Sequence, residues 1–189
     1  MARLLIVYGT TEGQTTKIAH LMAEIAAEHG VAVDVYDGRE LPASFSIGEY
    51  DGVLVGASVH QRGRYQPCIR AFVKRHRATL ERLPSAFFSV CLWAHSHSPR
   101  GQKHVNRYLD RFFRETGWRP RTVASFAGAY AYSRYGFATR LILRAIAWRR
   151  GGPTDTSRDH EFTDWQQVRQ FAKDFVATLS ASPVLAASQ

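Results

Sequence analysis

The sequence is poor in cysteine, and this scarcity narrows the class of protein. Cys68 and Cys91 are the only cysteines among 189 residues, and no Cys-x-x-Cys pair occurs. Two widely separated thiols predict neither a disulfide framework nor a structural zinc site, and they fit a reducing compartment. Cys91 comes at the end of an expected buried strand, where a thiol packs as a small apolar side chain.

The chain also lacks a long uncharged apolar run. No segment approaches the roughly 20 apolar residues that a membrane-spanning helix needs, so we expect no spanning helix. The N-terminal run Leu4–Tyr8 is short and leads directly into a Gly/Thr-rich loop. We therefore interpret it as a buried strand and not as a signal peptide. Peripheral membrane binding stays open.

Acidic residues are missing from Thr116 to Thr154, although the same stretch contains many arginines. The whole chain has a net charge of +9. Such a charge favours an anionic partner, which can be nucleic acid, phospholipid headgroups or a small molecule with carboxylates or phosphates. The alternative is a charge that only keeps the protein in solution.

Apolar runs alternate with helical stripes along most of the sequence. The expected strands are Leu4–Tyr8, Val31–Tyr36, Val53–Ala57, Ala86–Leu92 and Val123–Ala127. Stripes of period 3.6 lie between them, and a last helix begins after Asp164. This order predicts an α/β fold with a doubly wound, five-stranded parallel sheet and helices on both faces. We expect a single domain over residues 1–180, with an insertion at about 129–163 and a disordered tail at 181–189.

The loop after the first strand, YGTTEGQTTKIA (residues 8–19), has the residues of a phosphate cradle. Gly13 permits a tight turn, threonine hydroxyls donate to phosphate oxygens, and backbone N–H groups at a helix start favour an anion. Without a Walker lysine the loop suits one terminal monophosphate better than a triphosphate. A threonine-rich capped helix is the alternative. The expected contacts are Thr10, Thr11, Glu12, Gly13, Gln14 and Thr15.

The pattern Ile6-Val7-Tyr8-x-Thr10-x-x-Gly13-x-Thr15-x-x-x-Ala19 resembles the flavodoxin fingerprint, whose loop holds the phosphate of FMN. Met22 stands where that family usually has Ile, Leu or Val. In a flavodoxin-like sheet the loops after the third and fourth strands flank the flavin ring. The ring-side contacts that this implies are Ser58, Val59, Ser89, Val90, Cys91, Leu92, Trp93 and Ala94, with Asp155 closing the site. Trp93 either stacks on the flavin or packs under its own loop.

Histidines cluster near the same loops. A metal site is poorly supported, because His95-x-His97 has no third ligand at a defined spacing. We therefore expect no metal. His60 and His95 are the candidates for a catalytic proton acceptor, chosen for their position near the expected ligand and for no stronger reason.

The connection before the last helix is unusually long and both oily and basic. Between Phe137 and Trp148 a helix is apolar nearly all round, apart from Arg140 and Arg144 at i, i+4. It is too short to span a bilayer, but it can lie in the membrane interface or pack on the domain's own sheet edge. Alternation of arginines with large aliphatics argues against nucleic acid.

Five segments resemble a narrower family, the flavodoxin-like, menaquinone-dependent protoporphyrinogen IX dehydrogenases of bacterial haem synthesis. They are LPSAFFSV, GWRP, AGAYAYSRY, RLILRAIAWRRGGPTDTSRD and FTDW, and the resemblance runs from Arg3 to about Leu179. It implies an oxidoreductase that oxidises protoporphyrinogen IX to protoporphyrin IX with FMN and passes electrons to menaquinone or ubiquinone. A flavodoxin-type electron carrier and an NAD(P)H:quinone reductase are the alternatives.

The resemblance also implies partners and a place in the cell. We expect protoporphyrinogen IX, a membrane quinone and the anionic, cytoplasmic surface of the inner membrane as partners, and no nucleic acid. A homo-oligomer is left open. The expected contacts to substrate, quinone or membrane are Arg134, Phe137, Arg140, Leu141, Arg144 and Trp148. The loops at 59–65 and 95–105 depart from the family, so individual substrate contacts there are not assigned.

Overall fold

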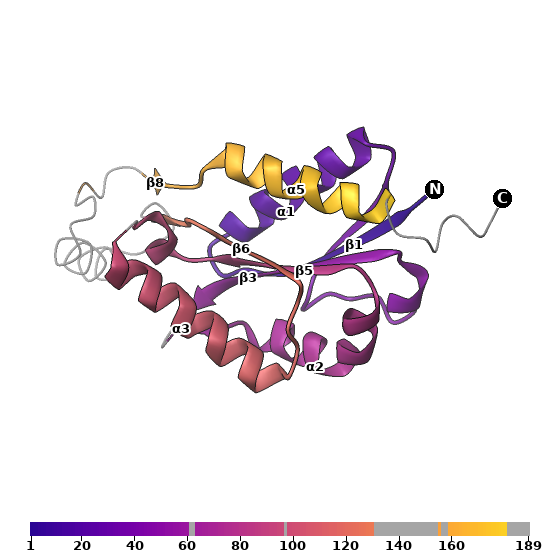
Figure 1. Ribbon diagram of the computed structural model, residues 1–189, viewed down its shortest axis with the longest axis horizontal. Helices are drawn as coiled ribbons and strands as arrows, with labels where there is room; N and C mark the ends of the chain where they lie inside the picture. Colours follow the sequence, from indigo (N-terminus) through magenta and orange to yellow (C-terminus); the bar gives the residue numbers. More distant parts are fainter. Residues whose placement is uncertain (61–62, 97, 131–154, 156–158, 181–189) are drawn as a thin grey trace.

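The chain folds around a twisted parallel sheet (Figure 1). The computed structural model describes residues 1–60, 63–96, 98–130, 155 and 159–180. The sheet has the order β2-β1-β3-β5-β6. Its strands are β1 (Arg3–Gly9), β2 (Ala32–Asp37), β3 (Gly52–His60), β5 (Ser85–Val90) and β6 (Thr122–Phe126). The predicted five-stranded, doubly wound sheet is confirmed.

In the part of the chain that the structure describes, long helices cover both faces of the sheet (Figure 1). α1 (Gln14–Glu28) and α5 (Trp165–Ser180) lie side by side on one face. α2 (Pro67–Arg82) and α3 (Pro99–Thr116) cover the other. Short 3₁₀ turns lie in the connections, among them η1 (Ile47–Glu49) and η3 (Leu92–His95). None of these described helices is both long and apolar enough to cross a bilayer.

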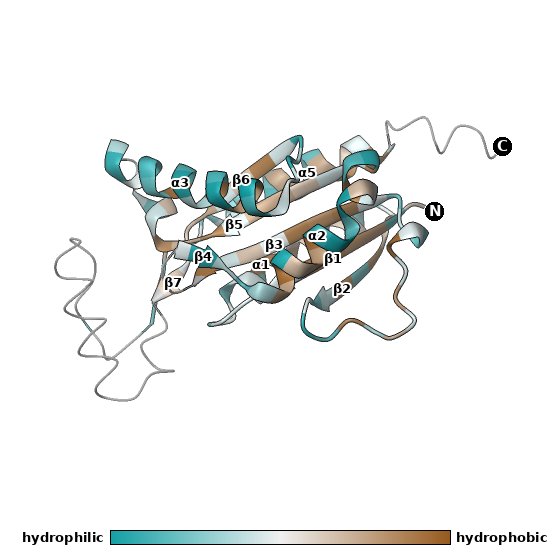
Figure 2. Cartoon of the chain, turned by 90° about the horizontal axis from the view of Figure 1, so that it is seen from below, coloured by the Kyte–Doolittle hydropathy of each residue, from teal (hydrophilic) through white to brown (hydrophobic). Residues whose placement is uncertain are grey.

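The two faces of the sheet have different cores. The α1/α5 side is mainly aliphatic, with Ile18, Met22 and Ile25 fully buried. The α2/α3 side is aromatic: Phe87 stacks on Phe112 with ring centroids 4.6 Å apart. Figure 2 shows the central strands mostly brown, α3 mostly teal and α2 in a mixture of teal and brown. The helices therefore turn only one stripe inward, as their sequence period predicts.

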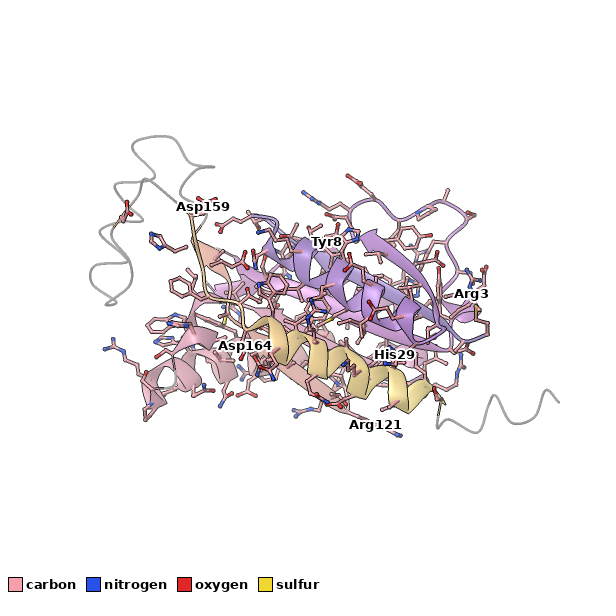
Figure 3. The ribbon with its side chains drawn as sticks, turned by 90° about the horizontal axis from the view of Figure 1, so that it is seen from above. Arg3, Tyr8, His29, Arg121, Asp159 and Asp164 are labelled. Atoms are coloured by element: carbon pink, nitrogen blue, oxygen red, sulfur yellow. The ribbon has the colours of Figure 1, made fainter. Side chains whose placement is uncertain are left out.

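Helix ends follow the capping residues in the sequence. Asp164 Oδ1 accepts the backbone N–H groups of Gln166 and Gln167 at 3.0 and 3.1 Å, at the start of α5 (Figure 3). This confirms Asp164 as the predicted N-cap. α3 ends at Gly117, whose φ of 73° lies in the left-handed region.

Small elements at the edge of the site were not predicted. β4 (Arg64–Tyr65) pairs antiparallel with the end of β3, and β7 (Ala129–Tyr130) pairs with β8 (His160–Glu161). Strands of two residues are too short to produce a periodic pattern, which is why the sequence does not predict them. The β7–β8 ribbon joins the two ends of the long connection. The predicted helix at 137–148 and the tail at 181–189 lie outside the described residues.

Candidate functional site

The site lies where the strand order reverses. β1 is flanked by β2 on one side and β3 on the other, and the chain leaves β1 through α1 on one face and β3 through α2 on the opposite face. The loops that follow these two strands therefore separate and leave an opening at the carboxyl ends of the strands. The loop after β5 adds the third side.

The loop after β1 is shaped as a cradle by its own backbone. Gly13 has a φ of 89°, a left-handed conformation that disfavours any residue with a Cβ. Its N–H donates to Thr10 Oγ1 at 2.9 Å, and its carbonyl accepts from the backbone N–H of Lys17 at 3.2 Å. The first turn of α1 thus begins inside the loop. Its N–H groups and the helix dipole favour an anion there.

A small cavity of about 100 Å³ opens between these loops. Most of its lining was predicted: Thr10, Thr11, Glu12, Gln14, Thr15, Ser58, Val59, Val90, Cys91 and Leu92. Gly128 and Ala129 complete the lining and were missed. They lie at the start of the long connection, shortly after β6. The sequence shows that they follow this strand, but it does not show that they lie next to the loop after β1. The phosphate-side and ring-side contacts therefore meet around one opening.

Thr15 provides the test of whether this cavity fits a phosphate. Its side chain is fully buried and its hydroxyl has no hydrogen-bond partner among the described residues. A buried hydroxyl without a partner costs about 1–3 kcal/mol, so such groups are rare unless a ligand completes them. A phosphate oxygen accepts from a hydroxyl, and the neighbouring Gly13–Gln14 backbone starts a helix. The residues fit the terminal monophosphate of FMN.

Gln66 links the phosphate side of the cavity to the ring side, and it was not among the predicted contacts. Its Nε2 donates to Thr11 Oγ1 at 3.2 Å and to Ser58 Oγ at 2.6 Å, and the side chain is buried. Gly9 lets it approach, because a Cβ there would lie 2.7 Å from Ile69 Cγ1 and 3.1 Å from Gln66 Cβ. The available signal was a polar residue directly before the proline that starts a helix.

The other side of the loop is fastened to the end of the long connection. Gln14 Nε2 donates to Thr163 Oγ1 at 2.8 Å, and Thr163 Oγ1 donates to the carbonyl of Ala127 at 2.7 Å. Lys17 Nζ and Glu161 Oε2 form an ion pair at 2.9 Å. The segment that returns from the connection is thus held against the helix whose N-terminus faces the cavity.

The loop after β5 begins in the core. Ser89 is fully buried, and its hydroxyl shares a 2.8 Å hydrogen bond with the Tyr65 hydroxyl. Burial raises the pKa of the Cys91 thiol, so this group stays protonated at neutral pH and is a poor nucleophile. Ser89 is therefore a support beneath the cavity, whereas Cys91 lines it.

Beyond Leu92 the loop turns away from the cavity. The Trp93 ring stacks on His104, with centroids 4.4 Å apart and an interplanar angle of 14°. His95 is exposed and its ring centroid lies 4.5 Å from that of Phe162. Ala94 and His95 line a second, larger hollow of about 610 Å³, which runs along β6 between α3 and α5. Stacking of Trp93 on a flavin and a proton-transfer role for His95 stay predictions.

The remaining predicted site residues are spread more widely. His60 ends β3 in register with Arg64. Asp155 is exposed, and its backbone carbonyl oxygen lies 2.8 Å from His160 Nε2. Asp155 is not among the residues that line the cavity. The described residues contain no cluster of three possible metal ligands. Six predicted contacts lie outside the described residues: Arg134, Phe137, Arg140, Leu141, Arg144 and Trp148.

The strand order and the monophosphate cradle define a flavodoxin-like, FMN-binding protein. Residues 5–157 match the flavodoxin domain family. Solved flavodoxins share the fold: flavodoxin 1 from Bacillus cereus has 17% identity and a TM-score of 0.53, covering 93% of this chain and 98% of that one. A flavodoxin from Streptococcus pneumoniae has 17% identity and a TM-score of 0.54, covering 95% and 99%.

Curated relatives narrow the assignment. A protein from Escherichia coli is 36% identical over 97% of this chain and 99% of its own length, and one from Leishmania major is 37% identical over 96% and 78%. Both are named protoporphyrinogen IX dehydrogenase (quinone). The chain belongs to the family of quinone-dependent protoporphyrinogen IX dehydrogenases.

Proposed function

We propose that this chain oxidises protoporphyrinogen IX to protoporphyrin IX and passes the electrons to a membrane quinone, in haem biosynthesis. The observation that carries the proposal is the 36% identity with the Escherichia coli dehydrogenase over nearly the full length of both chains. Identity at this level covers the long connection as well as the flavodoxin-like core. The cavity, with a buried Thr15 hydroxyl that has no hydrogen-bond partner among the described residues, supports the binding of FMN.

Bound FMN would supply two-electron redox chemistry, and three such rounds, each followed by reoxidation by quinone, are needed to convert one protoporphyrinogen IX to protoporphyrin IX. The chain's own residues hold and insulate the cofactor. The loop Thr10–Thr15 binds the phosphate, and Ser58, Val59, Val90 and Leu92 flank the isoalloxazine. Gln66 keeps the two groups of contacts in register. His60 and His95 are the proposed proton acceptors for the pyrrolic N–H.

The long connection is the proposed binding region for the substrate and for the membrane. Its arginines Arg134, Arg140 and Arg144 pair with the propionates of the porphyrinogen through charge-assisted hydrogen bonds. Phe137, Leu141 and Trp148 supply apolar contact for the macrocycle, the quinone or the lipid interface. The protein then works as a peripheral protein on the cytoplasmic side of the inner membrane.

One anaerobic experiment tests the function. FMN-loaded protein is mixed with protoporphyrinogen IX and menadione, and the fluorescence of the porphyrin product is followed. We expect fluorescence that depends on both FMN and quinone, and no FMN reduction by NADPH. Reduction by NADPH without porphyrin formation would instead identify an NAD(P)H:quinone reductase, and no turnover with either donor would leave an electron carrier.

A further inference from the structure

The positive charge of the described chain is concentrated on one face. α2 and α3 together contain ten basic and three acidic side chains, a net charge of +7. α1 and α5 contain three of each sign, a net charge of zero. The helices on the two faces have similar lengths, so the asymmetry comes from which residues occupy their outer surfaces.

On α3 the charges form a line along the outer surface. Arg100, Lys103, Arg107 and Arg114 are all exposed, and their spacing of three, four and seven residues keeps them on one side of the helix. Asp110 is the acidic residue on that line. The opposite side of α3 packs into the aromatic core.

α2 extends this surface with Lys74, Arg75 and Arg82, which are also exposed. α2 and α3 pack against each other, and Figure 2 shows both helices on the same side of the sheet. Where acids occur, they neutralise other arginines: Glu115 pairs with Arg70 and Arg111, and Glu81 pairs with Arg77. Among the described residues, no acidic side chain forms an ion pair with the exposed lysines and arginines named above on α2 and α3.

We infer that the α2–α3 face is a docking surface for the anionic headgroups of a phospholipid bilayer. The inference rests on the proposed function, because a protein that reduces a membrane quinone must approach the bilayer that dissolves it. Lys and Arg near an anionic bilayer each strengthen partitioning about fivefold, and the effect decays within a Debye length. This face is formed by α2 and α3 and acts through charge, without insertion into the bilayer.

Single-stranded nucleic acid is a poorer match for this face. Such ligands are bound by aromatic side chains on which bases stack, beside a basic groove. The exposed large hydrophobic residues of the described chain are Met1 and Val123, and neither lies on α2 or α3. The aromatic residues of these helices face the core.

Two matched charge reversals test the surface. Lys103→Glu with Arg107→Glu changes α3, and Arg169→Glu with Lys173→Glu changes α5, each pair being exposed and spaced i, i+4. Both variants lower the net charge equally, so a difference between them reports the face and not the total charge. The FMN-loaded proteins are mixed with phosphatidylcholine vesicles with or without phosphatidylglycerol, and partitioning is measured by co-sedimentation.

We expect the α3 variant to partition at least about 25-fold more weakly than the unchanged protein into vesicles with phosphatidylglycerol, since two cations are lost. The α5 variant should change partitioning less than about threefold. Raised salt should release the unchanged protein. Equal weakening by both variants would overturn the inference, as would an α3 effect on binding to single-stranded DNA without one on vesicles.

Measurements of enzymatic activity distinguish a failure of the docking surface from a failure of the proposed function. With menadione in solution and no vesicles, both variants should produce porphyrin at the unchanged rate. With a long-chain quinone in phosphatidylglycerol vesicles, the α3 variant alone should slow. If the unchanged protein forms no porphyrin under any condition, the proposed function fails, whatever the vesicle binding shows.

Discussion

The two ends of the cofactor site are built by different means. At the expected phosphate end the cavity is lined by one short loop, Thr10–Thr15, which is shaped by its own hydrogen bonds. At the ring end the contacts come from separate strands, and the loop after β5 leaves the cavity at Trp93 to stack on His104. A ligand that spans both ends therefore depends on what connects them, and Gln66 makes that connection.

The largest effect should come from the phosphate end. Thr15→Val should weaken FMN binding about 10- to 100-fold, because a hydrogen bond to a charged group is worth about 1.5–3 kcal/mol. The apoprotein should be no less stable, since the change removes a buried hydroxyl that has no partner among the described residues. Fluorescence titration with FMN and with riboflavin measures the first effect, and thermal unfolding of the apoprotein measures the second.

Riboflavin lacks the phosphate, so its affinity should not change in Thr15→Val. The matched control is Thr16→Val, which changes the next residue on the same helix but is not in the cavity lining. A loss of riboflavin affinity, or an apoprotein that unfolds more easily, would show that Thr15 supports the loop and does not face the phosphate.

Removing the link between the two ends should have the next largest effect. Gln66→Leu should weaken binding of FMN and of riboflavin alike, each by about five- to tenfold, because it deletes hydrogen bonds to both Thr11 and Ser58. A Gln102→Leu control changes an exposed glutamine on α3 and should leave both affinities unchanged. An effect on FMN alone would place Gln66 with the phosphate loop only.

A smaller effect is expected from the ring end. His104→Ala removes the stacking partner of Trp93 and should lower the free energy of unfolding by about 0.5–1.5 kcal/mol. FMN affinity should change less than about threefold, because this pair lies outside the cavity. Urea unfolding and FMN titration measure the two quantities. A large loss of FMN affinity would mean that Trp93 contacts the flavin after all.

The smallest effect should come from the ion pair that fastens α1 to β8. Burial alone would raise the pKa of Glu161, but hydrogen bonds from Lys17 and Trp165 outweigh it and lower the pKa below its ordinary value. A lowered pKa stabilises the fold above the pKa of the unfolded state, and this stabilisation is lost as the pH falls through the folded pKa.

Lys17→Met should therefore lower the free energy of unfolding by less than about 1 kcal/mol, as expected of an exposed pair. The difference from the unchanged protein should disappear in high salt and at acidic pH, measured by urea unfolding in matched buffers. A difference that persists in high salt would indicate lost packing of the lysine stem instead of lost charge.

The phosphate end of the site could be predicted from the sequence more completely than the ring end. The parallel strands and the phosphate loop follow from local patterns, because apolar runs and the Gly13 turn have their cause within a few residues. Gln66, Gly128 and Ala129 join the site through tertiary packing, which a single sequence does not encode at any fixed spacing. Trp93 shows the same limit, since its choice between flavin and His104 depends on where α3 lies.

The β7–β8 ribbon has a consequence for how such a protein can change over time. Because Ala129–Tyr130 pairs with His160–Glu161, the two ends of the long connection leave the domain from neighbouring points. The entropic cost of closing a loop rises slowly with its length, by only about 0.6 kcal/mol for each doubling. Segments of other lengths and compositions can thus replace the connection between β7 and β8 while the flavin-binding core keeps its fold. The same position suits the insertion of engineered segments.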